Sequence, residues 1–374
     1  MTLAASARRW LLATALMAGT MAAAGQADAA VRQHSATQSA LVRIAVVRTG
    51  VVRAAVAGKP RPAGQSRGFE LGAITTDLAD FDKAVKYRAS LRMLFLRWGS
   101  SIIPRKPIIN DAKLGAEAVI ELQPVHLSMI QVASGTDDQW LLDTLAPNLA
   151  AVGDPVTISF APEMNGQWYP WGTTKTTPAN YVLAWRHIHD VLAASPAGKL
   201  ITWLWQPSAI HFSTPSPLPF WPGSKYVNEI GLDGYYVLPN DTFDVIFKQT
   251  IKLMRTVSNA PILVGETAVG ATTGHLGPDI RNLFAGIREY HLLGLVWFNI
   301  AQHGGKYHQD WRLQDHPVGL RAFINQLAVV GHAGIPAFAP GGSGGGMSPA
   351  GPGASTMSFQ ITSFQITAGW SPAR

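Results

Sequence analysis

The sequence contains no cysteine, and only 14% of its 374 residues are charged. Without cysteine the chain can form neither disulfides nor thiolate metal sites, and it has no cysteine nucleophile. So low a charged fraction, together with 47% apolar residues, excludes a disordered polyelectrolyte. No His-Glu-x-x-His or calcium-loop pattern is present. His187 and His189 are two residues apart on a predicted helix, so their side chains face different directions and do not form a metal-binding pair. We therefore expect neither a metal nor a cofactor.

The positive charge is concentrated at the beginning of the chain. A formal charge of +7 and a pI of about 9.7 at first suggest binding to nucleic acid or to a membrane surface. Residues 1–69, however, contain nine Lys and Arg side chains and a single acid, Asp28, so they carry +8 and leave −1 for the remainder. A basic leader thus precedes a nearly neutral body, and we expect no nucleic-acid partner.

The leader has the pattern of an export signal. Arg8 and Arg9 precede an uncharged apolar run over 10–25, and small residues at 27–29 suit a cleavage site. This pattern predicts a signal peptide over 1–29 and a protein that is secreted, periplasmic or bound to the cell surface. The paired arginines leave both the general and the twin-arginine export routes open. The apolar run is short for a membrane span, so we expect no stable span after cleavage, and an uncleaved anchor is the alternative.

Two further segments are low in complexity. Residues 30–68 are basic and rich in Ala, Val and Pro, which predicts a linker or pro-segment, with surface tethering as the alternative. Residues 330–374 form a tail rich in Gly, Pro and Ser. The tail contains Gly-x-Ser-x-Gly at 341–345, but the strand and helix that a serine-hydrolase elbow requires are missing on both sides.

The body of the chain, residues 69–329, has the size of a (β/α)₈ barrel. Apolar runs, typical of parallel strands buried on both faces, alternate with amphipathic stretches. One such stretch has Leu78, Phe81 and Val85 at helical spacing, and Thr76 is placed to cap this helix. This alternation predicts a (β/α)₈ TIM barrel as a single catalytic domain. A doubly wound sheet is the alternative, although its glycine-rich phosphate loop is missing after the first run. The predicted strands are 69–75, 91–98, 116–123, 155–161, 200–205, 229–237, 261–266 and 293–299.

Two glutamates stand at the ends of predicted strands. Glu163 ends the fourth run and Glu266 ends the seventh, where a carboxylate is costly to bury unless it is paired or functional. In a barrel these strand ends meet at one mouth, where the active sites of such enzymes lie. Two facing carboxyl groups are what glycoside hydrolysis requires. Each glutamate alone could instead be an ion-pair partner.

Aromatic residues follow the same strand ends and suit a sugar substrate. Aromatic faces stack on pyranose rings, while indole and phenol groups hydrogen-bond hydroxyls. The alternative is that these large side chains fill the barrel. Among the twelve tryptophans of the chain, the candidates for sugar binding are Trp168, Trp171, Trp205 and Trp297.

The segment at 163–172, Glu-Met-Asn-Gly-x-Trp-Tyr-Pro-Trp-Gly, resembles the acid/base motif of glycoside hydrolase family 26. This family contains mannanases and related β-glycanases of the retaining (β/α)₈ clan. Matching motifs follow in order at 231–235, 265–266, 297–299 and 310–311, so the resemblance covers about residues 69–325.

The resemblance implies a role for each matching residue. It makes Glu163 the acid/base and Glu266 the nucleophile, with Tyr235 hydrogen-bonded to the nucleophile. Trp168 and Trp297 would line the central subsites. Asn165 would shape the loop or contact sugar. Retention implies that the two carboxyl groups lie about 5–5.5 Å apart.

One position departs from the family pattern. The family usually has a histidine before the acid/base glutamate, where this chain has Pro162. His126, after the third run, is either a replacement hydrogen-bond donor or a loop histidine.

Together these features predict a monomeric, secreted, retaining endo-β-glycanase that hydrolyses β-mannan or a related polysaccharide. One alternative is a glycanase for β-1,3-xylan, mixed-linkage glucan or an exopolysaccharide. Another is a catalytically weak carbohydrate-binding barrel.

Overall fold

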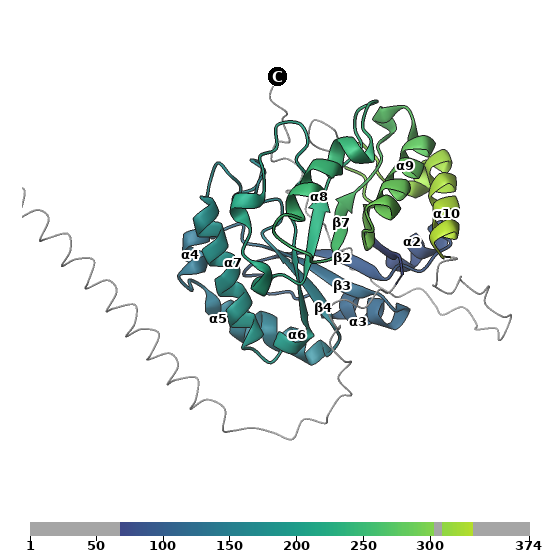
Figure 1. The fold of residues 1–374 in the computed structure, drawn as a ribbon. Helices are drawn as coiled ribbons and strands as arrows, with labels where there is room; N and C mark the ends of the chain where they lie inside the picture. The colour runs from purple at the N-terminus through teal and green to yellow at the C-terminus, as the bar shows by residue number, and fades with distance from the viewer. Residues whose placement is uncertain (1–67, 303–308, 332–374) are drawn as a thin grey trace, which may run out of the picture. The chain divides into compact units, whose positions relative to one another are not determined.

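The computed structural model describes residues 68–302 and 309–331, and in them eight parallel strands form a closed barrel (Figure 1). Each strand pairs with the next in the chain, and the first pairs with the eighth. The TIM-barrel prediction is confirmed, and the doubly wound alternative is wrong. The predicted leader, the linker and nearly all of the tail lie outside the described residues. The strands are β1 (Glu70–Ile74), β2 (Leu91–Arg97), β3 (Glu117–Gln123), β4 (Val156–Phe160), β5 (Ile201–Trp205), β6 (Glu229–Asp233), β7 (Ile262–Thr267) and β8 (Gly294–Phe298).

Helices follow the strands and pack on the outside of the barrel (Figure 1). In the described part of the chain, no helix is long and apolar enough to span a bilayer. Two of the segments below, η1 and η5, are π-helical, and the other η segments are 3₁₀ turns. The helices are α2 (Leu78–Val85), α3 (Arg105–Leu114), α4 (Met129–Ala133), α5 (Asp138–Trp140), α6 (Ala146–Val152), α7 (Pro178–Ala193), α8 (Gln249–Met254), α9 (Leu276–Glu289) and α10 (Pro317–Gly331). The shorter segments are η1 (Leu141–Leu145), η2 (Gly198–Leu200), η3 (Leu218–Phe220), η4 (Ser224–Tyr226), η5 (Asp244–Lys248), η6 (Ala271–Thr273) and η7 (Leu313–Asp315).

Strands β4 and β6 end earlier than their apolar runs predict, and both differences concern the mouth of the barrel. Strand β6 stops at Asp233 instead of Val237, because its register with β7 shifts at that residue. Strand β4 stops at Phe160, so Glu163 lies beyond the strand, in the loop that follows it. The chain turns sharply there, and the turn determines where Glu163 points.

A layer of aromatic rings fills the space between the barrel and its helices. Phe160 on β4 packs against Tyr181 and Trp185 of α7, and Trp203 on β5 packs against Trp185 from the other side. Because side chains alternate along a strand, these contacts identify the outward-facing positions of β4 and β5. The alternate positions then face the interior of the barrel, toward the mouth where the candidate site lies.

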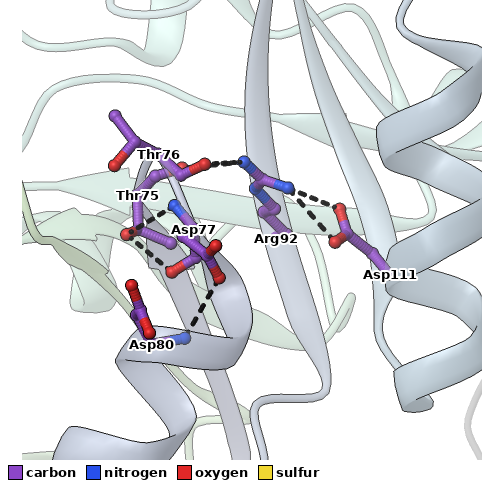
Figure 2. A network of polar contacts seen from close by, with 6 residues as sticks. All are labelled: Thr75, Thr76, Asp77, Asp80, Arg92 and Asp111. Carbon is purple, nitrogen blue, oxygen red and sulfur yellow. Dashed lines mark hydrogen bonds and ion pairs between the residues drawn. The ribbon is translucent and has the colours of Figure 1, made fainter. Parts of the chain in front are cut away.

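Arg92, an outward-facing residue of β2, joins the turn after β1 to helix α3 (Figure 2). One of its guanidinium nitrogens donates to both carboxylate oxygens of Asp111 at 3.1 Å. The other donates to the carbonyl oxygens of Thr75 and Thr76 at 3.0 and 2.9 Å. The cap of α2 also differs from the prediction, since Asp77 rather than Thr76 caps the helix and its side chain accepts the N–H group of Asp80.

We expect Arg92→Met to lower the free energy of unfolding by about 3–5 kcal/mol, because it leaves a buried carboxylate without its partner. The Asp111 side chain is only 4% exposed, and burial already raises its pKa although Arg92 opposes that shift. In denaturant unfolding, the double variant Arg92→Met/Asp111→Leu should recover most of the loss. Equal losses in the single and double variants would show that the ion pair is not the cause.

Candidate active site

Glu163 is held in position by a strained turn at the end of β4. Ala161 and Glu163 both have left-handed backbone angles, with φ of 45° and 53°, which costs a non-glycine residue of order 1–3 kcal/mol. The Glu163 N–H donates to the carbonyl of Gln206, after β5, at 2.7 Å. This link fixes the turn to the neighbouring strand, and the half-buried Glu163 side chain lies at the barrel mouth.

The rest of the 163–172 motif builds the loop around Glu163. The indole N–H of Trp168 donates to the Glu163 carboxylate at 2.7 Å. Gly166 makes this possible, because a Cβ there would lie 2.4 Å from the Trp168 ring. Gly172 similarly allows the loop to close, since a Cβ there would lie 2.4 Å from the Gly166 carbonyl.

Glu266 lies in β7, and Tyr235 comes from the loop directly after β6. The Tyr235 hydroxyl donates to the Glu266 carboxylate at 2.6 Å. The Tyr235 ring is held between Phe298 at the end of β8 and Trp311, with ring centroids 5.9 and 5.4 Å apart. Both the Tyr235 and the Glu266 side chains are half-buried. Glu266 therefore has a fixed orientation and access to solvent.

A second layer of polar side chains lies deeper in the barrel, below the two glutamates. Gln206 donates from its amide to Glu121 of β3 at 2.9 Å and to both oxygens of Asp233 of β6 at 3.1 and 3.0 Å. Glycines make room for this layer, because a Cβ at Gly265 would lie 2.7 Å from an Asp233 oxygen. Within residues 68–302 and 309–331, no three His, Asp or Glu side chains are grouped as a metal site would require.

The four carboxyl groups of the two layers have raised pKa values. Burial raises the pKa of Glu121 and Asp233 well above the usual range, and the charges of Glu163 and Glu266 raise them further. Burial also raises the pKa of Glu163, and hydrogen bonds from Trp168 and Ser208 oppose this effect. The pKa of Glu266 is raised by burial and by the charge of Glu163, while the Tyr235 hydroxyl lowers it. All four carboxyl groups therefore bind protons more tightly than ordinary carboxyl groups do.

Three of the tryptophans predicted to bind sugar lie outside the cavity. Trp205 is fully buried and packs edge-on against Trp221 on the outer side of β5. Trp297 is 1% exposed and packs against Phe323 of α10, so its neighbour Phe298 faces the site instead. Trp171 is also 1% exposed and donates to the Pro162 carbonyl. For these three residues the prediction of direct sugar contact is wrong.

Two other predicted positions have different outcomes. Asn165 is fully buried, and its amide bonds the backbone of Ser208 and Pro215. It therefore shapes the loops and does not reach substrate. His126 is exposed in the turn after β3, so its role as a donor stays a prediction.

Sequence reasoning missed Glu121, Gln206 and Phe298. A signal for the first was available, because Glu121 interrupts the apolar run of β3 and shares its strand face with Gln123.

Tyr169 was missed as well, although it belongs to the 163–172 motif. Its half-buried ring stacks on Trp171 at 4.6 Å, and burial, together with the charges of the site carboxyl groups, raises the pKa of its hydroxyl.

Residues 140–315 match a family model described as glycosyl hydrolase family 26, and the matched region contains both Glu163 and Glu266. The match covers the site-bearing part of the chain and supports its assignment to glycosyl hydrolase family 26. Endoglucanase H from Acetivibrio thermocellus is 25% identical over 244 residues, which are 61% of this chain and 26% of that protein. A mannan endo-1,4-beta-mannosidase from Bacillus subtilis (strain 168) is 26% identical over 227 residues, which are 56% of this chain and 56% of that protein.

The fold is also that of solved family 26 structures. A GH26 β-mannanase from Bacteroides ovatus superimposes with a TM-score of 0.54 at 18% identity, over 71% of this chain and 89% of that one. The chain covers 26% to 56% of the length of the curated relatives that it matches.

Proposed function

We propose that this protein is a retaining endo-β-glycanase that cleaves a polysaccharide by double displacement. The observation that carries the proposal is the pair Glu163 and Glu266, each with access to the barrel mouth. Trp168 donates a hydrogen bond to the Glu163 carboxyl group, and Tyr235 donates one to that of Glu266. Hydrolysis of a glycosidic bond needs a proton donor on one side of the bond and a nucleophile on the other.

In the first step, Glu266 attacks the anomeric carbon and the bond to the leaving oxygen breaks. Glu163 gives its proton to that oxygen, which departs as an alcohol, and a covalent glycosyl ester on Glu266 remains. In the second step, Glu163 takes a proton from water, which attacks the anomeric carbon and releases Glu266. The raised pKa of Glu163, caused by burial, keeps the proton available at neutral pH.

The proposed substrate is β-mannan or a related β-glycan. The relatives include both mannan endo-1,4-beta-mannosidases and an endoglucanase, so they favour a β-glycan without choosing the sugar. Pro162 leaves no imidazole before Glu163, and this supports a preference different from that of family members with a histidine there. The export signal predicted over 1–29 supports an activity outside the cytoplasm.

Reducing ends released from purified mannan, mixed-linkage glucan and β-1,3-xylan test the proposal. We expect release from at least one polymer, with a product mixture of internal cleavage. Binding to a polymer without any release would favour a carbohydrate-binding barrel instead.

Tyr235→Phe should change the pH profile as well as the rate. The hydroxyl stabilises ionised Glu266, so its removal raises the pKa of Glu266 further. Because the nucleophile must be ionised, we expect the acid limb of kcat/KM to move up by about one to two pH units. Tyr236→Phe is the matched control, since the Tyr236 hydroxyl contacts Asn282 instead. An acid limb that stays in place in Tyr235→Phe would contradict this role.

A further inference from the structure

Strand β2 contributes two side chains to the barrel mouth that the proposed mechanism does not use. Phe95 and Arg97 pair in register with Glu121 and Gln123 of β3. The Glu121 side chain lies inside the barrel, where it accepts a hydrogen bond from Gln206. Neighbouring parallel strands in register present the same face, so Phe95 and Arg97 also face inward.

The next residue supports this assignment. The ring of Trp98 packs against Trp140 and Phe160, in the aromatic layer outside the barrel. Side chains alternate along the strand, so Arg97 lies on the opposite, inner side. The inward-facing positions of β2 also become more accessible toward the mouth. Met93 is 1% exposed, while Phe95 is half-buried and Arg97 is exposed.

Within the part of the chain that the structure describes, the charge of Arg97 has no partner. Among the described residues its guanidinium makes no ion pair or side-chain hydrogen bond, whereas Arg92 and Arg312 pair with aspartates. Its positive charge is thus available to a ligand.

We propose that Phe95 and Arg97 form a subsite for a sugar residue that carries a carboxylate, as a uronic acid does. The pyranose ring stacks on Phe95, and the carboxylate pairs with the Arg97 guanidinium, whose planar fork matches it. Residues two apart on a strand are separated by about 7 Å, and the long Arg97 side chain can extend from there toward a carboxylate at the edge of a ring that stacks on Phe95. This inference rests on the proposed function and narrows the substrate to an acidic β-glycan.

The test compares one polymer with and without carboxylates, using a neutral glucomannan and the same glucomannan partly oxidised at C6. We expect the full-length protein to prefer the oxidised polymer at low salt. Arg97→Gln should lower kcat/KM on that polymer by about tenfold and change it less than twofold on the neutral one. Arg321→Gln is the matched control, because it removes one positive charge from α10, away from the barrel mouth. It shows how much of the effect comes from non-specific attraction between the acidic polymer and a protein with a basic segment at residues 1–69.

Phe95→Leu separates stacking from charge, and we expect it to raise KM on both polymers. Equal effects of Arg97→Gln and Arg321→Gln, or an unchanged ratio between the two polymers, would overturn the subsite. Affinity electrophoresis in a gel that contains each polymer measures binding independently of hydrolysis. If no polymer is hydrolysed, the proposed function fails. Slower migration of the protein in the oxidised polymer, abolished by Arg97→Gln, would still support the subsite.

Discussion

Glu266→Ala is expected to lower kcat by about 10⁴-fold or more on every polysaccharide that the protein hydrolyses. The covalent step needs a nucleophile at this position, and variants that lose a nucleophile retain only the contribution of binding and charge stabilisation. Tyr235 cannot replace it, because burial and the Glu266 charge raise its pKa well above the usual range, so it remains a phenol.

The loss should leave folding intact. Burial raises the pKa of Glu266, so ionised Glu266 destabilises the folded protein. The neutral isostere Glu266→Gln should therefore unfold at the same temperature as the wild type or at a higher one. Glu117→Gln is the matched control, since Glu117 lies at the start of β3, at the opposite end of the barrel, and contacts Thr157. Residual activity above a tenth of the wild-type value in Glu266→Ala would rule out its role as nucleophile.

Glu163→Ala is expected to have an effect that depends on the leaving group. Departure of a sugar alcohol needs the proton, so hydrolysis of a polysaccharide should slow by about 10²–10⁴-fold. An aryl glycoside with an acidic phenol leaves without that help, so its bond cleavage should be nearly unaffected. The second step then becomes limiting, because no base activates water.

Azide provides the complementary observation. It needs no general base, and in the space left by the Glu163 side chain it should attack the glycosyl ester and restore turnover of the aryl glycoside. The product would be a glycosyl azide with the configuration of the substrate. Equal losses on polysaccharide and aryl glycoside, with no azide effect, would contradict the acid/base assignment.

The barrel itself could be predicted from the sequence because its strands are continuous apolar runs. Each run is bounded by polar or turn residues and followed by a helical stretch, and this alternation allows few architectures. Strand ends were less predictable. Nothing in the apolar run 155–161 shows that Ala161 adopts a left-handed angle, yet this turn is what carries Glu163 to the mouth.

The same property made the aromatic residues hard to assign. In a strand buried on both faces, apolar side chains occupy odd and even positions alike. The sequence pattern therefore does not show which side chains point into the barrel. Trp297 and Phe298 are adjacent, and only the structure shows that Phe298 faces Tyr235 while Trp297 packs under α10. The motif glutamates were easier to place, because an acid at the end of an apolar run has few structural explanations.

The most direct test of the double displacement is to trap the glycosyl ester on the protein. A 2-deoxy-2-fluoro glycosyl fluoride of a β-glycan disaccharide slows the second step more than the first, so the ester should accumulate. Peptide mass mapping should then find one added glycosyl group, on Glu266, and none in Glu266→Gln. A label on another residue, or an inverted anomeric configuration of the first product by NMR, would contradict the mechanism.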